Sequence, residues 1–269
     1  IFLLWFIFFF LPVGNRGLWN PDEPRYLQVA WEMVNANAYL IPIFNGDLYA
    51  HKPPLFFWLT ILMSKISAFE TASRYVSALM SLGTIFLTYL MGKRYGGPRI
   101  GFTAALILMT TGLFLWLMGT GNIDTTLTFF TTLALYGFLL YEEKKKWFWI
   151  FLAYTSCGIG ILVKGPVALL TPWLIFLIWT IHRRSFKKEN IPYLHLTWGP
   201  AIALGIAAIW VLPACFIGGE SYTKELLITH NIGRAIDSFA HESPWYYYFL
   251  NFPGMFAPWS LVFLTVLFH

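Results

Sequence analysis

Charged residues are scarce in this chain. Only 12% of its 269 residues are Asp, Glu, Lys or Arg, whereas about 25% is usual for globular domains. Hydrophobic residues make up 58% of the chain and aromatic residues 20%. This composition excludes an ordinary water-soluble domain and predicts a polytopic membrane protein.

Features of several other protein classes are also missing. The two cysteines, Cys157 and Cys215, lie inside apolar runs, where a free cysteine behaves as a small buried hydrophobe. No GxxxxGK[ST] or GxGxxG phosphate-binding loop interrupts the chain. The formal net charge of +5 is small and its residues are scattered, so no nucleic-acid partner is predicted.

The two ends of the chain are apolar. Residues 1–13 form an apolar run without a preceding basic flank, and the chain stops at His269 directly after another such run. A signal peptide would need a charged start and a small-residue cleavage site. We therefore expect a fragment of a longer protein, with the first run as the second half of a spanning helix.

Long charge-free runs predict the membrane spans, since about 20 apolar residues cross the hydrocarbon core. Runs of this length exclude barrel strands, so an all-α bundle is expected. A twelve-residue apolar run at 53–64 is too short, and we interpret it as an interfacial or re-entrant helix. The eight predicted spans are the partial run 1–13 and residues 75–92, 100–123, 125–141, 147–163, 165–181, 196–219 and 243–268.

The distribution of basic residues orients these spans. The connections 93–99, 142–146 and 182–190 hold ten basic and three acidic residues, while the other polar positions hold eight basic and ten acidic residues. By the positive-inside rule these three connections are cytoplasmic. Loop 14–74, the turns at Asp124 and Lys164, and loop 218–242 then open together on the external face. If residues 53–64 crossed the membrane, the loop that contains Asp22 would lie on the opposite side from the other three segments, and the four would not form one site.

Loop 14–74 contains a predicted amphipathic helix. A residue before proline avoids the helical region, so we expect Glu23 to be non-helical and Pro24 to begin the helix. The apolar positions follow at helical spacing, and the helix should lie in the membrane interface. Its apolar face is predicted from Leu27, Ala30, Trp31 and Val34, and its polar face from Arg25, Gln28, Glu32 and Asn35.

Ionisable residues beside a bilayer are functional candidates by default, although each has a simpler interpretation. Asp22 and Glu23 could cap the helix, and Lys52 could extend to the interface from an apolar stem. Asp124 could be a hydrated helix end, and Lys164 could mark a turn. Two further candidates, Arg234 and His241, could be solvated residues of loop 218–242. Their gathering at one face favours a site over these separate interpretations.

Five landmarks occur in order along the chain: NPDEPRY, HKPPLFFWL, GNIDTT, LVKGPVALLTP and HESPWYYY. In this order and topology they resemble the GT-C class of membrane glycosyltransferases. The most similar group is that of the 4-amino-4-deoxy-L-arabinose transferases and dolichyl-phosphate-mannose protein mannosyltransferases. The resemblance runs the length of the chain, so residues 1–269 are expected to form one GT-C-like domain.

The resemblance implies transfer of a sugar from a polyprenyl phosphate to lipid A, another glycolipid or a protein. This reaction would take place on the external face of a bacterial inner membrane, among membrane lipids. By motif position, Asp22 corresponds to the family's candidate base, Lys52 to a lysine near the donor phosphate, and Asp124 to an acid that approaches this lysine. Glu23 would orient the acceptor or hold the loop. Lys164 and Arg234 would assist Lys52, and His241 is a further substrate-binding candidate.

One position departs from the resemblance. The arabinose transferases commonly carry Glu where this chain has His51, and a carboxylate there has been associated with a metal. Because His is itself a good ligand, His51 is retained as a substrate-binding candidate and a divalent metal remains open. A transporter or flippase for lipid-linked sugars is the alternative function. It should show internal repeats and ionisable residues near the bilayer midplane, and neither is visible.

Overall fold

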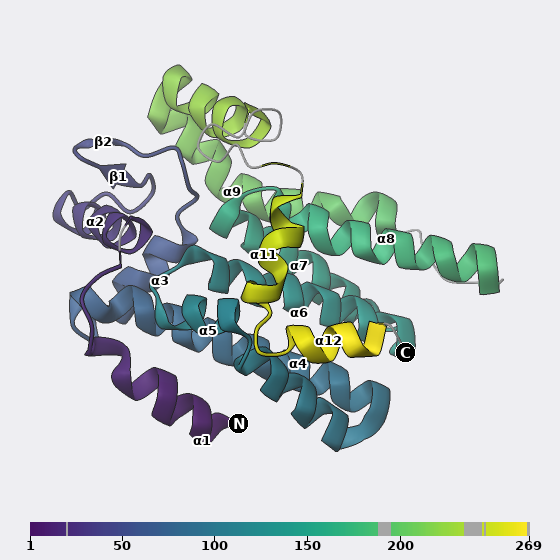
Figure 1. Ribbon diagram of the computed structural model, residues 1–269. Helices are drawn as coiled ribbons and strands as arrows, with labels where there is room; N and C mark the ends of the chain where they lie inside the picture. The colour runs from purple at the N-terminus through teal and green to yellow at the C-terminus, as the bar shows by residue number, and fades with distance from the viewer. Residues whose placement is uncertain (20, 188–194, 234–243, 245, 268–269) are drawn as a thin grey trace.

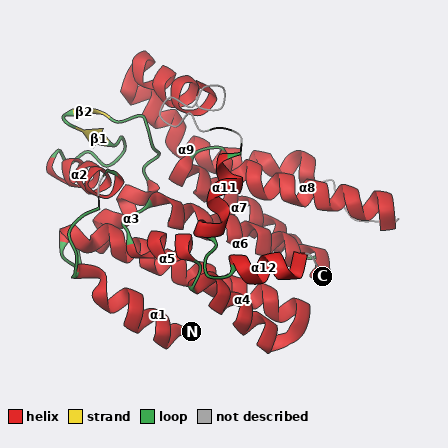
Figure 2. Ribbon diagram, in the orientation of Figure 1, coloured by secondary structure: helices red, strands yellow, loops and turns green. Residues whose placement is uncertain are grey.

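A computed structural model describes residues 1–19, 21–187, 195–233, 244 and 246–267, and it is almost entirely helical (Figures 1 and 2). Its only described strands form a short hairpin beside α2. The described elements are α1 Phe2–Trp5, η1 Phe6–Phe10, η2 Leu11–Gly14, α2 Asp22–Asn35, β1 Ile43–Phe44, β2 Asp47–Leu48, α3 Leu55–Met63, α4 Phe69–Met109, α5 Gly112–Gly119, α6 Ile123–Lys144, α7 Trp147–Lys164, α8 Val167–Lys187, α9 His195–Lys224, η3 Glu225–Gly233, α11 Tyr247–Met255 and α12 Ser260–Leu267.

Within the described residues, four helices are long and apolar enough to cross a membrane, or five if the bent pair α11 and α12 counts as one span. These four begin at Phe69, Ile123, Trp147 and His195. The helices α6, α7 and α9 confirm three predicted runs as single helices. The count of eight single-helix spans is not confirmed.

Two of the predicted runs are interrupted. Run 100–123 is divided among the end of α4, the short α5 and the start of α6, because the backbone leaves the helical region at Thr111, Thr120 and Asn122. In run 243–268, α11 and α12 meet at an angle of 115°. Neither run is a continuous helix, so an apolar sequence of sufficient length was not enough to predict a straight span.

Conversely, α4 folds back on itself. Gly96 and Gly97 depart from helical geometry, and Gly97 has a φ of 84°. A Cβ built on Gly101 would lie 2.5 Å from the carbonyl oxygen of Tyr89. Twelve residues of straight helix would separate these positions by about 18 Å, so the two legs of α4 pack against each other. Two predicted runs thus lie in one helical element.

The hairpin is tied to α2. Its turn residues Asn45 and Gly46 have φ values of 56° and 85°, the left-handed pair that a two-residue type I′ turn requires. The Glu32 carboxylate accepts hydrogen bonds from their backbone N–H groups at 2.9 and 3.0 Å. Ile43 pairs with Leu48 across the two strands. Figure 1 shows this hairpin and α2 together at one end of the helical bundle.

Two of the hydrophobic clusters among the described residues, both rich in aromatic side chains, position the helices around the site. Tyr26 and Met33 of α2 pack with Phe56 and Phe57 of α3, and Ile123 of α6 joins the same cluster. A second cluster lies among α6, α7, α8 and α9, where Phe138 stacks on Phe176 at 4.7 Å between ring centroids. The first cluster fixes α2 against the beginning of α6, which places their polar ends side by side.

Candidate active site

The acidic pair lies inside the first turn of α2. This helix begins at Asp22, with Pro21 as its N-cap, and no side chain caps it. The prediction that the helix begins at Pro24 is therefore wrong by two residues. Proline is tolerated in a first helical turn because N–H groups there have no intrahelical partner. Asp22 is partly exposed, whereas Glu23 is buried.

The buried face of α2 also differs from the prediction. Leu27 and Ala30 are buried as expected, but Trp31 is 55% exposed. The inward face instead runs through Glu23, Tyr26 and Met33 together with Leu27 and Ala30. This is the same helical spacing rotated toward Glu23, since the carboxylate of Glu23 finds charged partners inside the protein.

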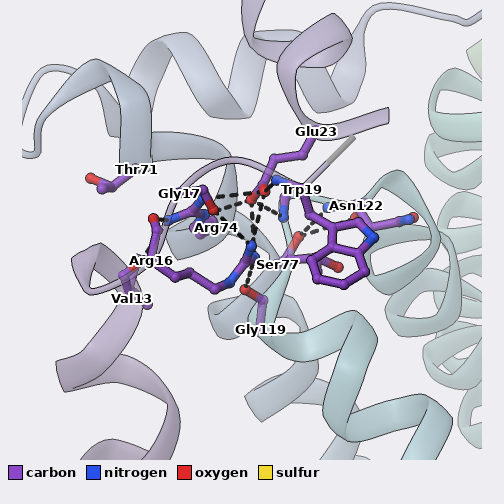
Figure 3. A network of polar contacts seen from close by, with 12 residues as sticks. Val13, Arg16, Gly17, Trp19, Glu23, Thr71, Arg74, Ser77, Gly119 and Asn122 are labelled. Atoms are coloured by element: carbon purple, nitrogen blue, oxygen red, sulfur yellow. Dashed lines mark hydrogen bonds and ion pairs between the residues drawn. The ribbon is translucent and has the colours of Figure 1, made fainter. Parts of the chain in front are cut away.

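Glu23 is the centre of a polar network (Figure 3). Its carboxylate accepts from Arg74 Nε at 2.5 Å, from the backbone N–H of Trp19 at 2.6 Å and from that of Gly121 at 2.9 Å. Arg16 donates to both oxygens at 3.3 Å. Burial by itself would raise the pKa of Glu23, but these hydrogen bonds outweigh it and hold the pKa below its ordinary value.

Arg74 and Arg16 extend the network to the backbone. The Arg74 guanidinium donates to the carbonyl oxygens of Val13, Arg16 and Gly17 at 2.9 to 3.0 Å. Arg16 donates to the carbonyl oxygen of Gly119 at 2.7 Å. The network therefore joins residues 13–23 to α4 and to the turn that precedes α6.

This turn positions Asp124. The backbone N–H of Asn122 donates to Ser77 Oγ at 2.9 Å. The Asn122 side chain in turn accepts from the backbone N–H of Asp124 at 2.7 Å and caps α6. A Cβ on Gly121 would lie 2.2 Å from Ser73 Oγ, so only glycine fits between Glu23 and α4.

Asp124 forms an ion pair with Lys164. The Lys164 ammonium at the end of α7 donates to Asp124 Oδ1. The sequence resemblance instead implied that Asp124 approaches Lys52. Both carboxylate and ammonium are about one-third exposed, so the pair can be reached from outside the helical core. The structure thus unites two of the predicted site residues, and a role of Lys52 beside Asp124 stays a prediction.

Asp22 and Asp124 both lie near the buried Tyr26. Burial raises the pKa of the Tyr26 phenol, and the negative charges of Asp22 and Asp124 raise it further. Arg25 forms an ion pair with Asp22 and lies with its guanidinium carbon 5.5 Å from the centroid of the Tyr26 ring. Two pairs of opposite charge, Arg25 with Asp22 and Lys164 with Asp124, therefore lie near one buried tyrosine.

The loop before α3 brings His51 to this region. The His51 ring stacks on Tyr49, with 4.9 Å between centroids and 21° between planes. Tyr49 in turn lies near enough to Arg25 to favour its charged form. Lys52 follows directly and is half-buried. Across the described part of the chain, no three His, Cys, Asp or Glu residues are grouped as a metal site would need. Arg234 and His241 lie outside the described residues.

Three residues of this region were missed by the sequence analysis: Arg16, Arg74 and Tyr26. Arg16 and Arg74 stand at the borders of apolar runs, where an arginine is usually a solvated flank. The motif NPDEPRY contains one signal for them. Two adjacent carboxylates on a helix face different directions, and a carboxylate that faces the protein interior needs a cation as its partner. Which arginine supplies it depends on a contact across 51 residues, and spacing alone does not reveal it.

The sequence is similar to that of known membrane glycosyltransferases. A sequence profile described as dolichyl-phosphate-mannose-protein mannosyltransferase matches residues 51–211. The undecaprenyl phosphate-alpha-4-amino-4-deoxy-L-arabinose arabinosyl transferase of Pseudomonas savastanoi pv. phaseolicola is 30% identical over 250 residues, 89% of this chain and 45% of that protein. An uncharacterized protein of Aquifex aeolicus is 28% identical over 264 residues, 97% of this chain and 52% of that protein.

Solved structures share the fold. The crystal structure of ArnT from Cupriavidus metallidurans bound to undecaprenyl phosphate has a TM-score of 0.87 and 22% identity, over 98% of this chain and 49% of that one. Its apo state has a TM-score of 0.79. The chain spans about half the length of the curated relatives it matches. Since the profile covers more than half of the residues, this chain belongs to the dolichyl-phosphate-mannose-protein mannosyltransferase family, within the GT-C glycosyltransferases.

Proposed function

We propose that the protein transfers a sugar from a polyprenyl phosphate to an acceptor at the external face of the membrane. The observation that carries this proposal is the partly exposed carboxylate of Asp22. The buried network around the adjacent Glu23 holds it in place, and the ion pair of Lys164 with Asp124 lies in the same region. Family membership favours a transferase over a transporter or flippase. The names of the arabinosyl transferases support undecaprenyl phosphate as the carrier.

The proposed reaction is a single displacement with inversion at the anomeric carbon. Asp22 takes the proton of the acceptor, general-base catalysis that contributes about 10² to 10⁴ in rate. Lys52 and Lys164, with Arg234 beyond the described residues, stabilise the departing lipid phosphate, and such electrostatic stabilisation is often the largest contribution to catalysis. Glu23 is buried among two arginines, so it holds the loop rather than contacting the acceptor.

The domain and its orientation belong to the same proposal. Residues 1–269 form one GT-C-like transmembrane domain in a bacterial inner membrane, with loops 14–74 and 218–242 on the periplasmic side. Counting the two legs of α4 separately, taking α11 and α12 as one bent span and adding the two shorter apolar helices supports a bundle of about eight spans. The nine-residue α3 is about 14 Å long, too short to cross the core, so it lies at the interface with α2.

Transfer of radiolabelled sugar tests this function directly. The full-length protein in lipid nanodiscs is given an undecaprenyl-phosphate-linked labelled sugar with lipid A, or with an acceptor peptide, as acceptor. Label should move to one acceptor and depend on Asp22. Release of undecaprenyl phosphate without labelled product, or movement of intact donor across the bilayer, would contradict the proposal.

A further inference from the structure

Arg25 forms an ion pair with the proposed base. Its Nη2 donates to Asp22 Oδ1 from one turn further along α2. The two side chains are 35% and 44% exposed, so a substrate can reach both. The sequence pattern placed Arg25 on the polar outer face of an interfacial helix. In the structure it contacts Asp22 and lies near the Tyr26 ring.

One donor of this guanidinium is unused. The Arg25 Nε is buried and has no hydrogen-bond partner within the described part of the chain. Leaving a buried donor unsatisfied is costly. A guanidinium presents its N–H groups as a planar fork that matches two oxygens of a phosphate. Because Nε is buried, an anion would bind the exposed part of the guanidinium, where Nη2 contacts Asp22.

The surroundings keep Arg25 charged. Burial by itself would lower the pKa of Arg25, but Tyr49, Asp22 and a hydrogen bond with Tyr26 raise it above its ordinary value. Asp124, which holds Lys164, also lies near this tyrosine. An anion between the two pairs would thus meet two cations, each already held by one carboxylate.

We propose that Arg25 binds the phosphate of the lipid-linked donor and that this binding releases Asp22 to act as the base. This inference rests on the proposed function. Without donor, Arg25 occupies the Asp22 carboxylate. With donor bound, the phosphate takes over the guanidinium. The acceptor hydroxyl then gives its proton to Asp22 as its oxygen bonds to the anomeric carbon, and the bond from this carbon to the phosphate oxygen breaks with its electron pair leaving on the polyprenyl phosphate.

Competition between Asp22 and the phosphate has a measurable consequence. Two groups that compete for one guanidinium are coupled, so removal of one charge must strengthen binding of the other. Asp22→Asn should therefore bind undecaprenyl phosphate a few-fold more tightly than the parent. The same substitution should have no effect once Arg25 is replaced by Gln. A purely structural role of Arg25 would not produce this pattern.

The experiment measures binding of undecaprenyl phosphate to the full-length protein in nanodiscs for the parent, Asp22→Asn, Arg25→Gln and the double variant. We expect Arg25→Gln to weaken binding about tenfold and Arg25→Lys, which keeps the charge, to weaken it less. Arg94→Gln is the matched control. It removes a guanidinium from a partly exposed pair with Glu143 beside the fold-back of α4 and should leave binding unchanged. Phosphatidic acid is included as a competitor.

Three outcomes would overturn the inference. The first is binding of undecaprenyl phosphate that is unchanged in both Arg25→Gln and Arg25→Lys. The second is an effect of Asp22→Asn on binding that is the same with Arg25 as without it. The third is competition by phosphatidic acid as strong as that of undecaprenyl phosphate itself, which would assign the site to ordinary phospholipid headgroups. The proposed function is tested separately. Arg25-dependent binding with no sugar transfer would contradict the function alone, whereas sugar transfer with Arg25-independent binding would contradict this inference alone.

Discussion

Glu23 and Arg74 form a buried ion pair across 51 residues, with 2.5 Å between Oε1 and Nε and both side chains 2% exposed. Every charged contact of Glu23 lies within this network. Because Asp22 precedes Glu23 and Gly121 is three residues before Asp124, the pair fixes the spacing of the two site carboxylates. The pair therefore matters because it holds Asp22 and Asp124 in place relative to each other.

Removing the cation of this pair should destabilise the fold strongly. Arg74→Met leaves Glu23 buried without its main partner, and loss of one member of a buried pair typically costs about 3 to 5 kcal/mol. Thermal unfolding of the purified protein measures the change. Arg94→Met, in a pair that is partly exposed, should cost about 0 to 1 kcal/mol. Equal losses in the two variants would contradict a special role of the buried pair.

The same pair predicts a dependence of stability on pH. The pKa of Glu23 is lower in the folded state than its ordinary value, which is about 4.3 in unfolded chains. Its contribution is thus fully present above that value and is lost as the pH falls through the folded-state pKa. The difference in melting temperature between parent and Glu23→Gln should be constant from pH 6 to 8 and shrink in strong acid. A difference that grows on acidification would show the opposite sign.

Sequence patterns predicted the parts of the fold that depend on local chemistry. Charge-free runs located α6, α7 and α9, and the cap at Asn122 belongs to a motif that was recognised at the start of a span. The turn at Gly97 lies within the predicted connection 93–99, whereas the breaks at Thr111 and Thr120, inside an apolar run, were missed. Hydrophobicity there is uniform, so only packing against neighbouring helices decides whether the helix continues.

The sequence predicted which charged residues gather in this region but not which of them form ion pairs. Asp22, Asp124 and Lys164 do lie together, since the polar ends of helices in a bilayer meet at one surface. The partner of each carboxylate depends on side-chain direction, and spacing could not choose between Lys52 and Lys164 for Asp124. Arg25 is partly exposed, as expected for the polar face, but its ion pair with Asp22 was not predicted.

Membrane orientation is open to a direct test. Ala36 is exposed at the end of α2, and Tyr95 is 76% exposed in the basic connection within α4. With Cys157 and Cys215 replaced by Ala, Ala36→Cys should react with an impermeant thiol reagent in intact cells, and Tyr95→Cys only after permeabilisation. Labelling of Tyr95→Cys from outside would reverse the proposed orientation.

The role of Asp22 as base predicts a loss of rate rather than of binding. Asp22→Asn keeps the size of the side chain but removes its basicity, so kcat for sugar transfer should fall by about 10² to 10⁴ with donor affinity retained or increased. Asp47→Asn, on the exposed strand β2, is the matched control and should retain its activity. If Asp22→Asn were as active as the parent, the carboxylate would serve only the helix end.

The ion pair between Lys164 and Asp124 predicts that the two residues act as one unit. Asp124 holds the Lys164 ammonium at the end of α7. Once Asp124 is neutralised, Lys164 is no longer aimed at the donor phosphate, so further removal of Lys164 should cost little. We expect Asp124→Asn and Lys164→Gln each to lower kcat/KM for the donor by about tenfold or more, and the double variant to resemble the poorer single variant.

The same cycle with Lys52→Gln and Asp124→Asn distinguishes the two lysines, since independent residues give losses that multiply. The pair of Glu142 and Lys145 at the other end of α6 should leave transfer unchanged when both are replaced by Gln. Losses that multiply for Asp124 with Lys164 but not for Asp124 with Lys52 would show that the carboxylate serves Lys52 during the reaction.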